Sequence, residues 1–274
     1  MWLLTSTLSN EAFMAWGWRL PFLFSIVLIV VGYVIRRAVE ESPIFTELQQ
    51  RRTESSAPLA TLFRHHGREV ILTALIFIAN NAAGYLLIAF FTTYVSTVVG
   101  MPRPTALLMT TLAAFGWLVF TMFGGWLSDR IGRVRTFQIG YALIAVWSIP
   151  MWFLIDSGSV ALFFIALFVL TIGLGLSYGP QAALYAEMFP ADVRYSGVSI
   201  GYALGAILGG AFAPLIAELL LSNTGKSWSI GVYVLAITIV SLVAVSLVKE
   251  TRGTALDTHS IDVVAARTAA VKVR

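Results

Sequence analysis

Residues 124–135 read GGWLSDRIGRVR and join two long apolar runs. These runs, Pro104–Ser128 and Thr136–Ile155, contain no Asp, Glu, Lys or Arg. A helix that crosses the hydrocarbon core of a bilayer needs about 20 mostly apolar residues, and each run is long enough. Charged side chains are costly inside hydrocarbon, so the basic stretch predicts a short polar loop between two membrane-spanning helices.

The rest of the chain has the same character. Of its 274 residues, 58% are hydrophobic and 12% are charged, whereas about a quarter of the residues in a soluble domain are charged. So few charges cannot cover a water-soluble surface, and the lipid bilayer is the expected partner. The runs are too uniformly apolar for barrel strands, which alternate. The predicted fold is an all-α integral membrane protein of about seven helices. The other five runs are Leu20–Ile35 (lengthened by Phe13–Trp18), Val70–Pro102, Ser157–Ala186, Tyr195–Ala217 and Ser227–Val248.

The Lys and Arg residues predict an orientation. The loops after odd-numbered runs, together with the C-terminal tail, hold fifteen of the 18, and the other side holds three. Because cytoplasmic loops are enriched in Lys and Arg, the larger group and the C-terminus are expected in the cytoplasm. Seven spans then place the N-terminus outside, although residues 1–18 carry no export signal, so we expect upstream helices to be missing. The fifteen are Arg36, Arg37, Arg51, Arg52, Arg64, Arg68, Arg130, Arg133, Arg135, Arg194, Lys249, Arg252, Arg267, Lys272 and Arg274, and the three are Arg19, Arg103 and Lys226.

The composition argues against other classes of protein. There is no Cys, which excludes thiolate nucleophiles and Cys-based metal sites. The adjacent pair His65 and His66 has no third metal ligand nearby, and no nucleophile–base pair or phosphate loop is present, so we expect neither a metal site nor an enzyme. A nucleic-acid partner is not expected either. A complete seven-helix protein remains an alternative, but a retinal pigment would need a Lys inside Ser227–Val248, which has none.

The loop 124–135 resembles the loop signature of the major facilitator superfamily, G-x-L-x-D-R-x-G-R-[RK]-[RK]. It departs from that signature at Val134, where a basic residue is usual. Gly132 permits a tight reversal, and we expect Asp129 to lie at a helix N-terminus while Arg133 pairs with carboxylates. An ordinary basic loop is the alternative. The matching residues are Gly125, Leu127, Asp129, Arg130, Gly132, Arg133 and Arg135.

Four further segments carry the same resemblance. Residues 16–22, WGWRLPF, are similar to the entry to the sixth helix in the metabolite:H+ symporter family, which makes them the most specific match. Residues 40–45 resemble the element after the sixth helix, and residues 249–253 resemble the exit from the twelfth. Residues 186–190, with Arg194 and Gly197, resemble the element between the tenth and eleventh helices.

The resemblance implies a domain plan. The seven spans would be helices six to twelve, and helices seven to twelve would form one bundle that contains a three-plus-three inverted repeat. Residues 1–38 would then end a missing N-terminal bundle, and residues 39–68 would be a cytoplasmic inter-bundle loop. Residues 69–250 would be the six-helix C-terminal bundle, and residues 251–274 a disordered cytoplasmic tail.

The resemblance also implies a function, namely H+-coupled symport of a small organic metabolite, such as an organic acid or a betaine, across a bacterial inner membrane. No cofactor is expected beyond the proton gradient. The expected partner is the missing N-terminal bundle or a second copy of the chain. Sugar transport, drug efflux and a truncated protein without transport remain as alternatives.

Polar residues inside the spans are the candidate substrate site, because hydrocarbon penalises them. No charged residue lies in the middle of any run, so no proton-binding carboxylate is expected there. The expected cavity residues are Asn80, Asn81, Tyr85, Tyr178 and Gln181; packing between helices is the alternative for each. Gly201, Gly205 and Gly209 are assigned to close helix packing. Glu187 and Arg194 join the loop motif as gating candidates. Because Glu187 lies near a helix end, it is also a candidate for the proton-coupling carboxylate, and an ion pair with Arg194 or a loop arginine is its simpler role.

Overall fold

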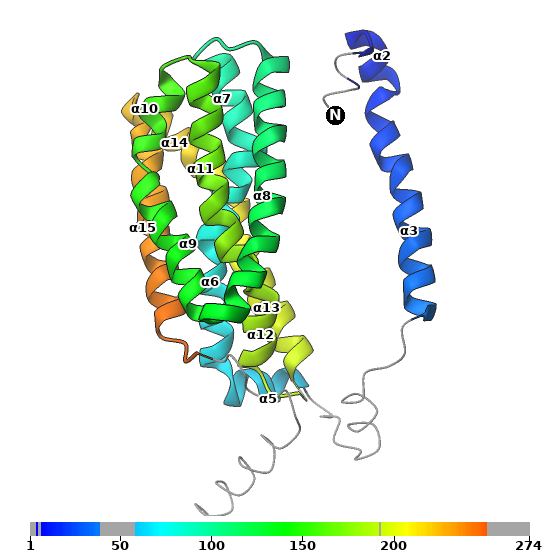
Figure 1. Cartoon of the computed structure of the whole chain (residues 1–274), viewed down its shortest axis with the longest axis vertical. Helices are drawn as coiled ribbons and strands as arrows, with labels where there is room; N and C mark the ends of the chain where they lie inside the picture. Colours follow the sequence, from blue (N-terminus) through cyan, green and yellow to red (C-terminus); the bar gives the residue numbers. More distant parts are fainter. Residues whose placement is uncertain (1–3, 5–6, 39–57, 192, 251–274) are drawn as a thin grey trace, which may run out of the picture. The chain divides into compact units, whose positions relative to one another are not determined.

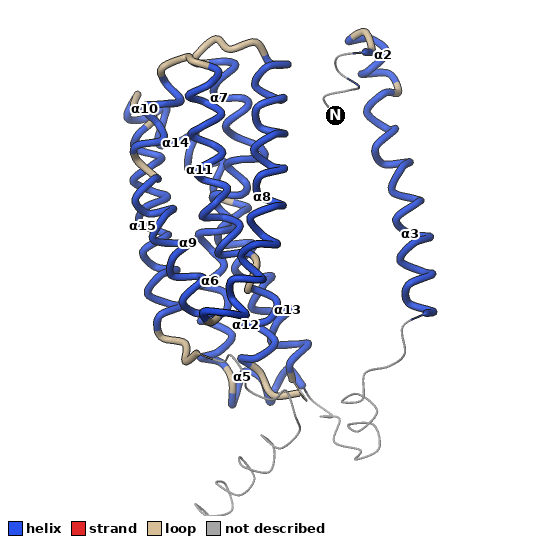
Figure 2. Tube along the Cα trace, in the orientation of Figure 1, coloured by secondary structure: helices blue, strands red, loops and turns tan. Residues whose placement is uncertain are grey.

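The computed structural model describes residues 4, 7–38, 58–191 and 193–250 and divides the chain into two units. The first unit is Met1–Thr53 and the second is Glu54–Arg274. Within the described residues the secondary structure is helix, and no strand is present there (Figures 1 and 2). The prediction of an all-α membrane fold is therefore confirmed. The expected element at residues 40–45 and the expected tail at 251–274, which includes His259, lie outside the described residues.

The first unit is a single apolar helix with a short entry. Helix α2 (Asn10–Ala15) begins at Ser9, whose hydroxyl accepts a hydrogen bond from the Ala12 amide, and the turn η1 (Gly17–Arg19) leads into α3 (Leu20–Ala38). Residues 17–37 are long and apolar enough to cross a membrane. Each end carries a basic side chain over an aromatic ring, Arg19 on Trp18 and Arg37 on Tyr33, as at the two interfaces of a bilayer.

The second unit is a bundle of five long spans and one bent span. Three of the five long spans are broken or bulged, and α8 and α15 are single regular helices. The elements in chain order are α5 (Pro58–His65), α6 (Gly67–Tyr85), η2 (Leu86–Phe90), α7 (Phe91–Thr97), α8 (Arg103–Ile131), α9 (Arg133–Trp147), α10 (Pro150–Asp156), α11 (Val160–Tyr178), α12 (Gln181–Met188), α13 (Arg194–Ala206), η3 (Ile207–Ala211), α14 (Ala213–Thr224) and α15 (Trp228–Ser246).

The count of spans agrees with the sequence. Six helices of the described residues pass the length and hydropathy required to cross a membrane, and α9 with α10 makes a seventh if the bent pair is one span. That pair bends by 51° just before Pro150. Proline has no amide hydrogen and its ring clashes with the preceding turn, which explains the bend. The sequence treated Thr136–Ile155 as one run and did not predict this break.

Glycines set the closest helix contacts. A Cβ on Gly124 of α8 would lie 2.6 Å from the Gly175 carbonyl oxygen of α11, so only glycine permits this approach. A Cβ on Gly205 of α13 would similarly lie 2.7 Å from the Ala74 carbonyl oxygen of α6. The expected packing role of Gly205 is confirmed.

The break at Gly179 and Pro180 lies at a close contact between two helices. In the structure a Cβ on Gly179 would collide with the α8 backbone at Gly125, so this face of the break is buried against α8. The close approach of the two backbones, rather than a cavity, explains why glycine occupies position 179.

Two spans contain a π-helical turn that was not predicted. Turn η2 lies between α6 and α7, and turn η3 lies between α13 and α14. They belong to neighbouring spans, because Asn81 of α6 donates a 2.8 Å hydrogen bond to the Ala206 carbonyl oxygen just before η3. Such turns insert one residue into a helix and often mark functional sites.

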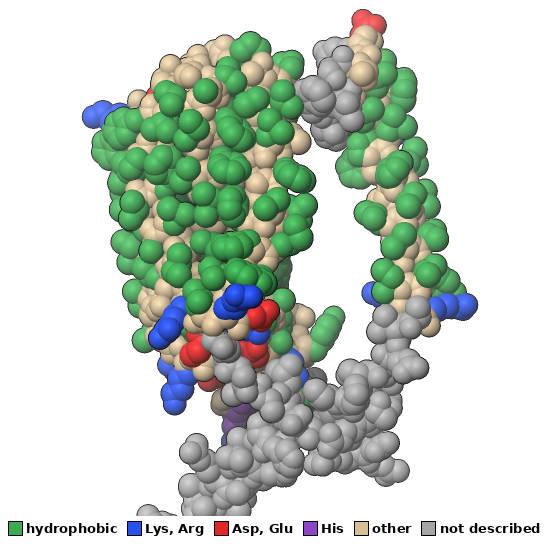
Figure 3. Space-filling view, viewed as in Figure 1, with side chains coloured by type: hydrophobic (Ala, Val, Ile, Leu, Met, Phe, Trp, Pro, Cys, Tyr) green, Lys and Arg blue, Asp and Glu red, His purple; other side chains and the backbone are tan. Residues whose placement is uncertain are grey.

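The two ends of the bundle differ in charge. In Figure 3 the visible face is mostly hydrophobic, and the charged side chains of the bundle gather chiefly at one end. At the opposite end Asp156 of α10 accepts hydrogen bonds from Tyr94 of α7, at 2.7 Å, and from Ser227 at the start of α15. The apolar middle and charged end are the pattern expected of a bundle embedded in lipid.

Candidate functional site

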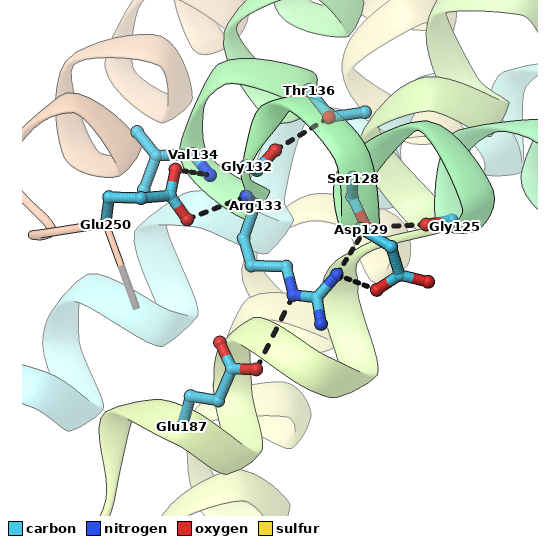
Figure 4. A network of polar contacts seen from close by, with 9 residues as sticks. All are labelled: Gly125, Ser128, Asp129, Gly132, Arg133, Val134, Thr136, Glu187 and Glu250. Carbon is cyan, nitrogen blue, oxygen red and sulfur yellow. Dashed lines mark hydrogen bonds and ion pairs between the residues drawn. The ribbon is translucent and has the colours of Figure 1, made fainter. Parts of the chain in front are cut away.

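The loop motif forms a polar network at the charged end of the bundle (Figure 4). Gly132 connects α8 to α9 with φ of 110°, a conformation that side chains other than glycine rarely adopt. The carboxylate of Glu250 accepts hydrogen bonds from the backbone amides of Arg133, at 2.8 Å, and Val134, at 3.1 Å. A Cβ on Gly132 would collide with this carboxylate. The chain exit after α15 therefore caps the N-terminus of α9.

Glu250 is a residue that sequence reasoning missed as part of the site. The segment 249–253 was matched to the exit from a twelfth helix but was given no partner. The expectation that Asp129 lies at a helix N-terminus is wrong. Asp129 lies in the last turn of α8 and pairs with Arg133 across the loop, while Glu250 occupies the helix N-terminus. Only the folded structure brings residue 250 within reach of residue 133.

Arg133 connects three parts of the network. Its guanidinium pairs with Asp129, donates a 3.0 Å hydrogen bond to the Ser128 hydroxyl, and lies 3.5 Å from Glu187 of α12. The Glu187 side chain is 10% exposed and that of Asp129 is 68% exposed, so the contact with α12 is the buried one. Of the two roles left open for Glu187, the structure supports the ion pair with a loop arginine, namely Arg133.

The other gating candidates contact neighbouring segments. Arg130 stacks over Trp126, with 4.2 Å to the ring centroid. Arg194 donates from Nε to the Phe189 carbonyl oxygen at 3.2 Å and so holds the turn before α13. Gly125 packs beside Gly179: a Cβ on Gly125 would lie 3.7 Å from the carbonyl oxygen of Gly179. A cavity of about 260 Å³ adjoins Glu187; it is lined by Arg68, Glu69, Leu72, Glu187, Met188, Leu247, Val248 and Lys249.

The two asparagines in α6 have different surroundings. Asn80 is buried and donates from Nδ2 to the Leu174 carbonyl oxygen at 2.9 Å and to the Ser177 hydroxyl at 2.7 Å. It therefore has the packing role between α6 and α11 and does not line a cavity in this bundle. Asn81 is half-buried; its nitrogen bonds to Ala206, which leaves its oxygen facing another direction.

Tyr178 and Gln181 lie on either side of the break between α11 and α12. Tyr178 is on the surface of the bundle, and Tyr85 of α6 is also exposed. Gln181 is only 5% exposed, and its Oε1 has no hydrogen-bond partner within the described structure. Tyr185, one turn further along, is buried and donates to the Thr73 carbonyl oxygen at 3.1 Å. Buried polar atoms in proteins are normally hydrogen-bonded, so the unpaired amide oxygen of Gln181 is expected to bind water or a ligand.

Aromatic residues that the sequence analysis did not select surround Tyr178. The Phe77 ring lies 6.4 Å and the Trp117 ring 6.1 Å from that of Tyr178, and Tyr202 stacks on Phe77 at 4.3 Å. Tyr202 directly follows Gly201 of the packing glycines, and Trp117 directly follows Gly116, whose Cβ would lie 3.0 Å from Phe168 of α11. A large aromatic beside a glycine that contacts another helix was the signal that could have identified both.

The sixth span takes in a carboxylate that the run in the sequence excluded. The sixth run was ended at Ala217, but the span continues through α14 to Thr224. Glu218 is therefore within the helix, about 9 Å from its end at the rise of an α-helix, and its side chain is exposed on the bundle. Among the described residues no cluster of His, Asp or Glu could hold a metal ion.

Comparison with known proteins gives a consistent family. The sequence model of the Major Facilitator Superfamily matches residues 3–209. The inner membrane metabolite transport protein YhjE of Escherichia coli K12 is 35% identical over 93% of this chain and 59% of its own length. The shikimate transporter of the same organism is 30% identical, over 91% and 58%. The glycine betaine/proline/ectoine/pipecolic acid transporter OusA of Dickeya dadantii is 28% identical, over 91% and 51%. The chain spans between half and three fifths of these relatives.

Proposed function

Since this chain belongs to the major facilitator superfamily, as a multi-pass membrane protein, we propose that it forms the C-terminal half of a transporter for a small organic metabolite. In this proposal α3 is the sixth helix and the second unit is the bundle of helices seven to twelve. The relatives are named as transporters of metabolites, shikimate, betaine or proline, so an organic acid or an osmolyte of that size is the proposed substrate class.

The observation that carries the proposal is the unpaired Oε1 of the buried Gln181 beside the half-exposed Tyr178. Inside a lipid bilayer an unpaired polar group costs free energy unless water, protein or a ligand meets it. A transporter of this kind places its substrate site near the midplane, between two bundles. The polar groups of α6, α11 and α12 supply one side of such a site.

The mechanism requires a second bundle. Alternating access arises when two bundles rock about a site at their interface, and the second unit supplies one of them. The network of Arg133, Glu187 and Glu250 ties α9 to α12 and to the chain exit at the end that we propose is cytoplasmic. This network would keep the bundle rigid while it moves as a body. An N-terminal bundle, or a second copy of this chain, would supply the rest.

The proposal also includes coupling to H+. No carboxylate lies near the middle of the described spans, and Glu218 lies towards the end of its own span. The protonated group would therefore be Glu218 or a residue of the second bundle. The proposed location is the inner membrane, with the C-terminus in the cytoplasm.

Uptake into proteoliposomes tests the proposal. The chain would be reconstituted alone and together with the first five helices of YhjE of Escherichia coli. Uptake of radiolabelled glycine betaine, proline and shikimate would then be measured under an imposed pH gradient. We expect protonophore-sensitive uptake of at least one solute by the combined halves and none by the chain alone, because one bundle cannot alternate access. Coupled uptake by the chain alone would contradict this expectation and would mean that a second copy of the chain supplies the other bundle. Absence of uptake in both preparations would contradict the proposed function.

A further inference from the structure

Aromatic side chains from four helices meet on one surface of the bundle. Tyr85 of α6, Tyr178 of α11 and Tyr202 of α13 are 48%, 37% and 40% exposed. The hydroxyl of Tyr202 lies within electrostatic reach of the other two hydroxyls. Phe77 of α6 and Trp117 of α8 pack against these rings from below and beside, at 4.3 to 6.4 Å between centroids. We call these five residues the aromatic wall.

Glycines leave the space that the rings of the aromatic wall occupy. A Cβ on Gly84 would lie 2.7 Å from the Trp117 indole, and a Cβ on Gly210 would lie 2.7 Å from the Tyr85 ring. The rings therefore occupy space that only glycine leaves free. Phe77 is almost fully buried and fixes Tyr202 by stacking. Such support limits the rotamers of the rings, so the wall keeps its shape when the surface is uncovered.

The surface presents partial negative charge and no cation. The faces of aromatic rings are negative. Gln181, three residues after Tyr178 and across the break, has a buried amide oxygen without a hydrogen-bond partner in the described structure. In the described parts of the contributing helices, Lys, Arg, Asp and Glu occur only in the first or last turns. These residues are Arg68, Glu69, Arg103, Asp129, Arg130, Glu187 and Arg194. A carboxylate would find no positive partner here, whereas an organic cation would find several negative ring faces.

We propose that the aromatic wall binds an alkylated ammonium group of the transported solute by cation–π contact. This inference rests on the proposed transport function and narrows its substrate class. A carboxylate on the same solute would be held by groups outside the wall. Cation–π contacts contribute most when the cation has lost its water, which is the situation at a site enclosed between two bundles.

A neutral isostere separates charge from shape. Glycine betaine and 3,3-dimethylbutanoate differ only by the replacement of the quaternary nitrogen with carbon. Binding of each to the 274-residue chain, reconstituted in lipid nanodiscs together with the first five helices used above, would be measured by calorimetry and by quenching of tryptophan fluorescence. We expect glycine betaine to bind saturably and the isostere to bind roughly 2- to 30-fold more weakly, the range of a cation–π contact.

Paired variants separate the ring from the hydroxyl. Tyr178→Phe and Tyr202→Phe keep the ring and should keep the preference for glycine betaine, while Tyr178→Leu and Tyr202→Leu should remove it. Tyr195→Leu is the control, because Tyr195 lies 86% exposed at the start of α13, away from the wall. The ratio of the two affinities is the deciding quantity, since general damage to the fold would weaken both ligands together.

Three results would overturn the inference: equal affinity for the two ligands, equal loss of preference in the Phe and Leu variants, or no saturable binding of glycine betaine by folded chain. The proposed function fails separately. If the combined halves accumulate shikimate but the chain shows no preference for the ammonium ligand, transport stands and the aromatic wall has another role. If the preference is found and no solute is accumulated, the inference stands and the transport proposal fails.

Discussion

At the scale of single residues, two ion pairs of the same chemical type differ in how far their carboxylates are buried. Asp129 and Glu187 are both carboxylates beside Arg133, but Asp129 is solvent-exposed and Glu187 is nearly buried. An exposed ion pair contributes about 0–1 kcal/mol because water competes for both charges. A buried charge that loses its partner costs more, since it has given up its hydration. The buried position of Glu187 on α12 therefore makes its ion pair the more important of the two for stability.

This difference predicts unequal effects of two matched substitutions. Glu187→Gln leaves the buried guanidinium of Arg133 without its inner carboxylate and should lower the free energy of unfolding by about 1–3 kcal/mol. Asp129→Asn should lower it by less than about 1 kcal/mol. Thermal unfolding of each purified variant in the same detergent, followed by tryptophan fluorescence, measures both. A larger loss from Asp129→Asn would show that the exposed pair, rather than the buried one, holds the network together.

At the scale of helices, side-chain size at the crossings controls packing. The span from α13 to α14 lies on α6 through Gly201, Gly205 and Gly209, while the π-helical turn η3 shifts the register by one residue. Helices in lipid gain little from the hydrophobic effect, so close backbone approach supplies most of their attraction. The turn and the glycines together set which residues of α13 reach the surface, Tyr202 among them.

The crossing of α13 with α6 gives the second prediction. Gly205→Leu should destabilise the bundle by about 1–3 kcal/mol, because its Cβ alone would lie 2.7 Å from the Ala74 carbonyl oxygen and 2.8 Å from Phe77. Gly67→Ala is the control, since nothing lies within 4 Å of a Cβ at that position. Unfolding by an increasing mole fraction of denaturing detergent measures both. Equal stability of the two variants would mean that α13 does not pack on α6 in lipid.

At the scale of the whole molecule, the two ends of the second unit are chemically different. One end gathers Glu187, Arg133, Glu250 and the pocket beside Arg68, and the other holds Asp156 with Tyr94 and Ser227. Such an asymmetry is what the distribution of Lys and Arg along the sequence predicts for a protein with one cytoplasmic side.

Cysteine labelling tests the orientation directly. The chain has no native Cys, so Ser128→Cys and Thr105→Cys each give a single reactive position. Thr105→Cys should react with a membrane-impermeant maleimide added outside intact cells. Ser128→Cys is buried and should react only after the membrane is opened, more slowly than an Arg135→Cys control at the exposed start of α9. If Thr105→Cys were labelled from the cytoplasmic side alone, the proposed topology would be wrong and the opposite orientation would hold.

The sequence by itself determined the class of protein, the number of spans and the expected orientation. Each of these depends on the hydropathy or charge of a local stretch, because lipid acts on every segment of about 20 residues separately. It also identified Gly132 and Arg133 as members of one polar region, since a loop motif is contiguous, and it offered a loop arginine as one partner of Glu187. Only the tertiary structure decided the partners: Glu250 rather than Asp129 at the start of α9, a packing role for Asn80, and the meeting of Tyr178 with Phe77 and Trp117. Those contacts join residues up to 117 positions apart, and which helix faces meet depends on how the whole bundle packs.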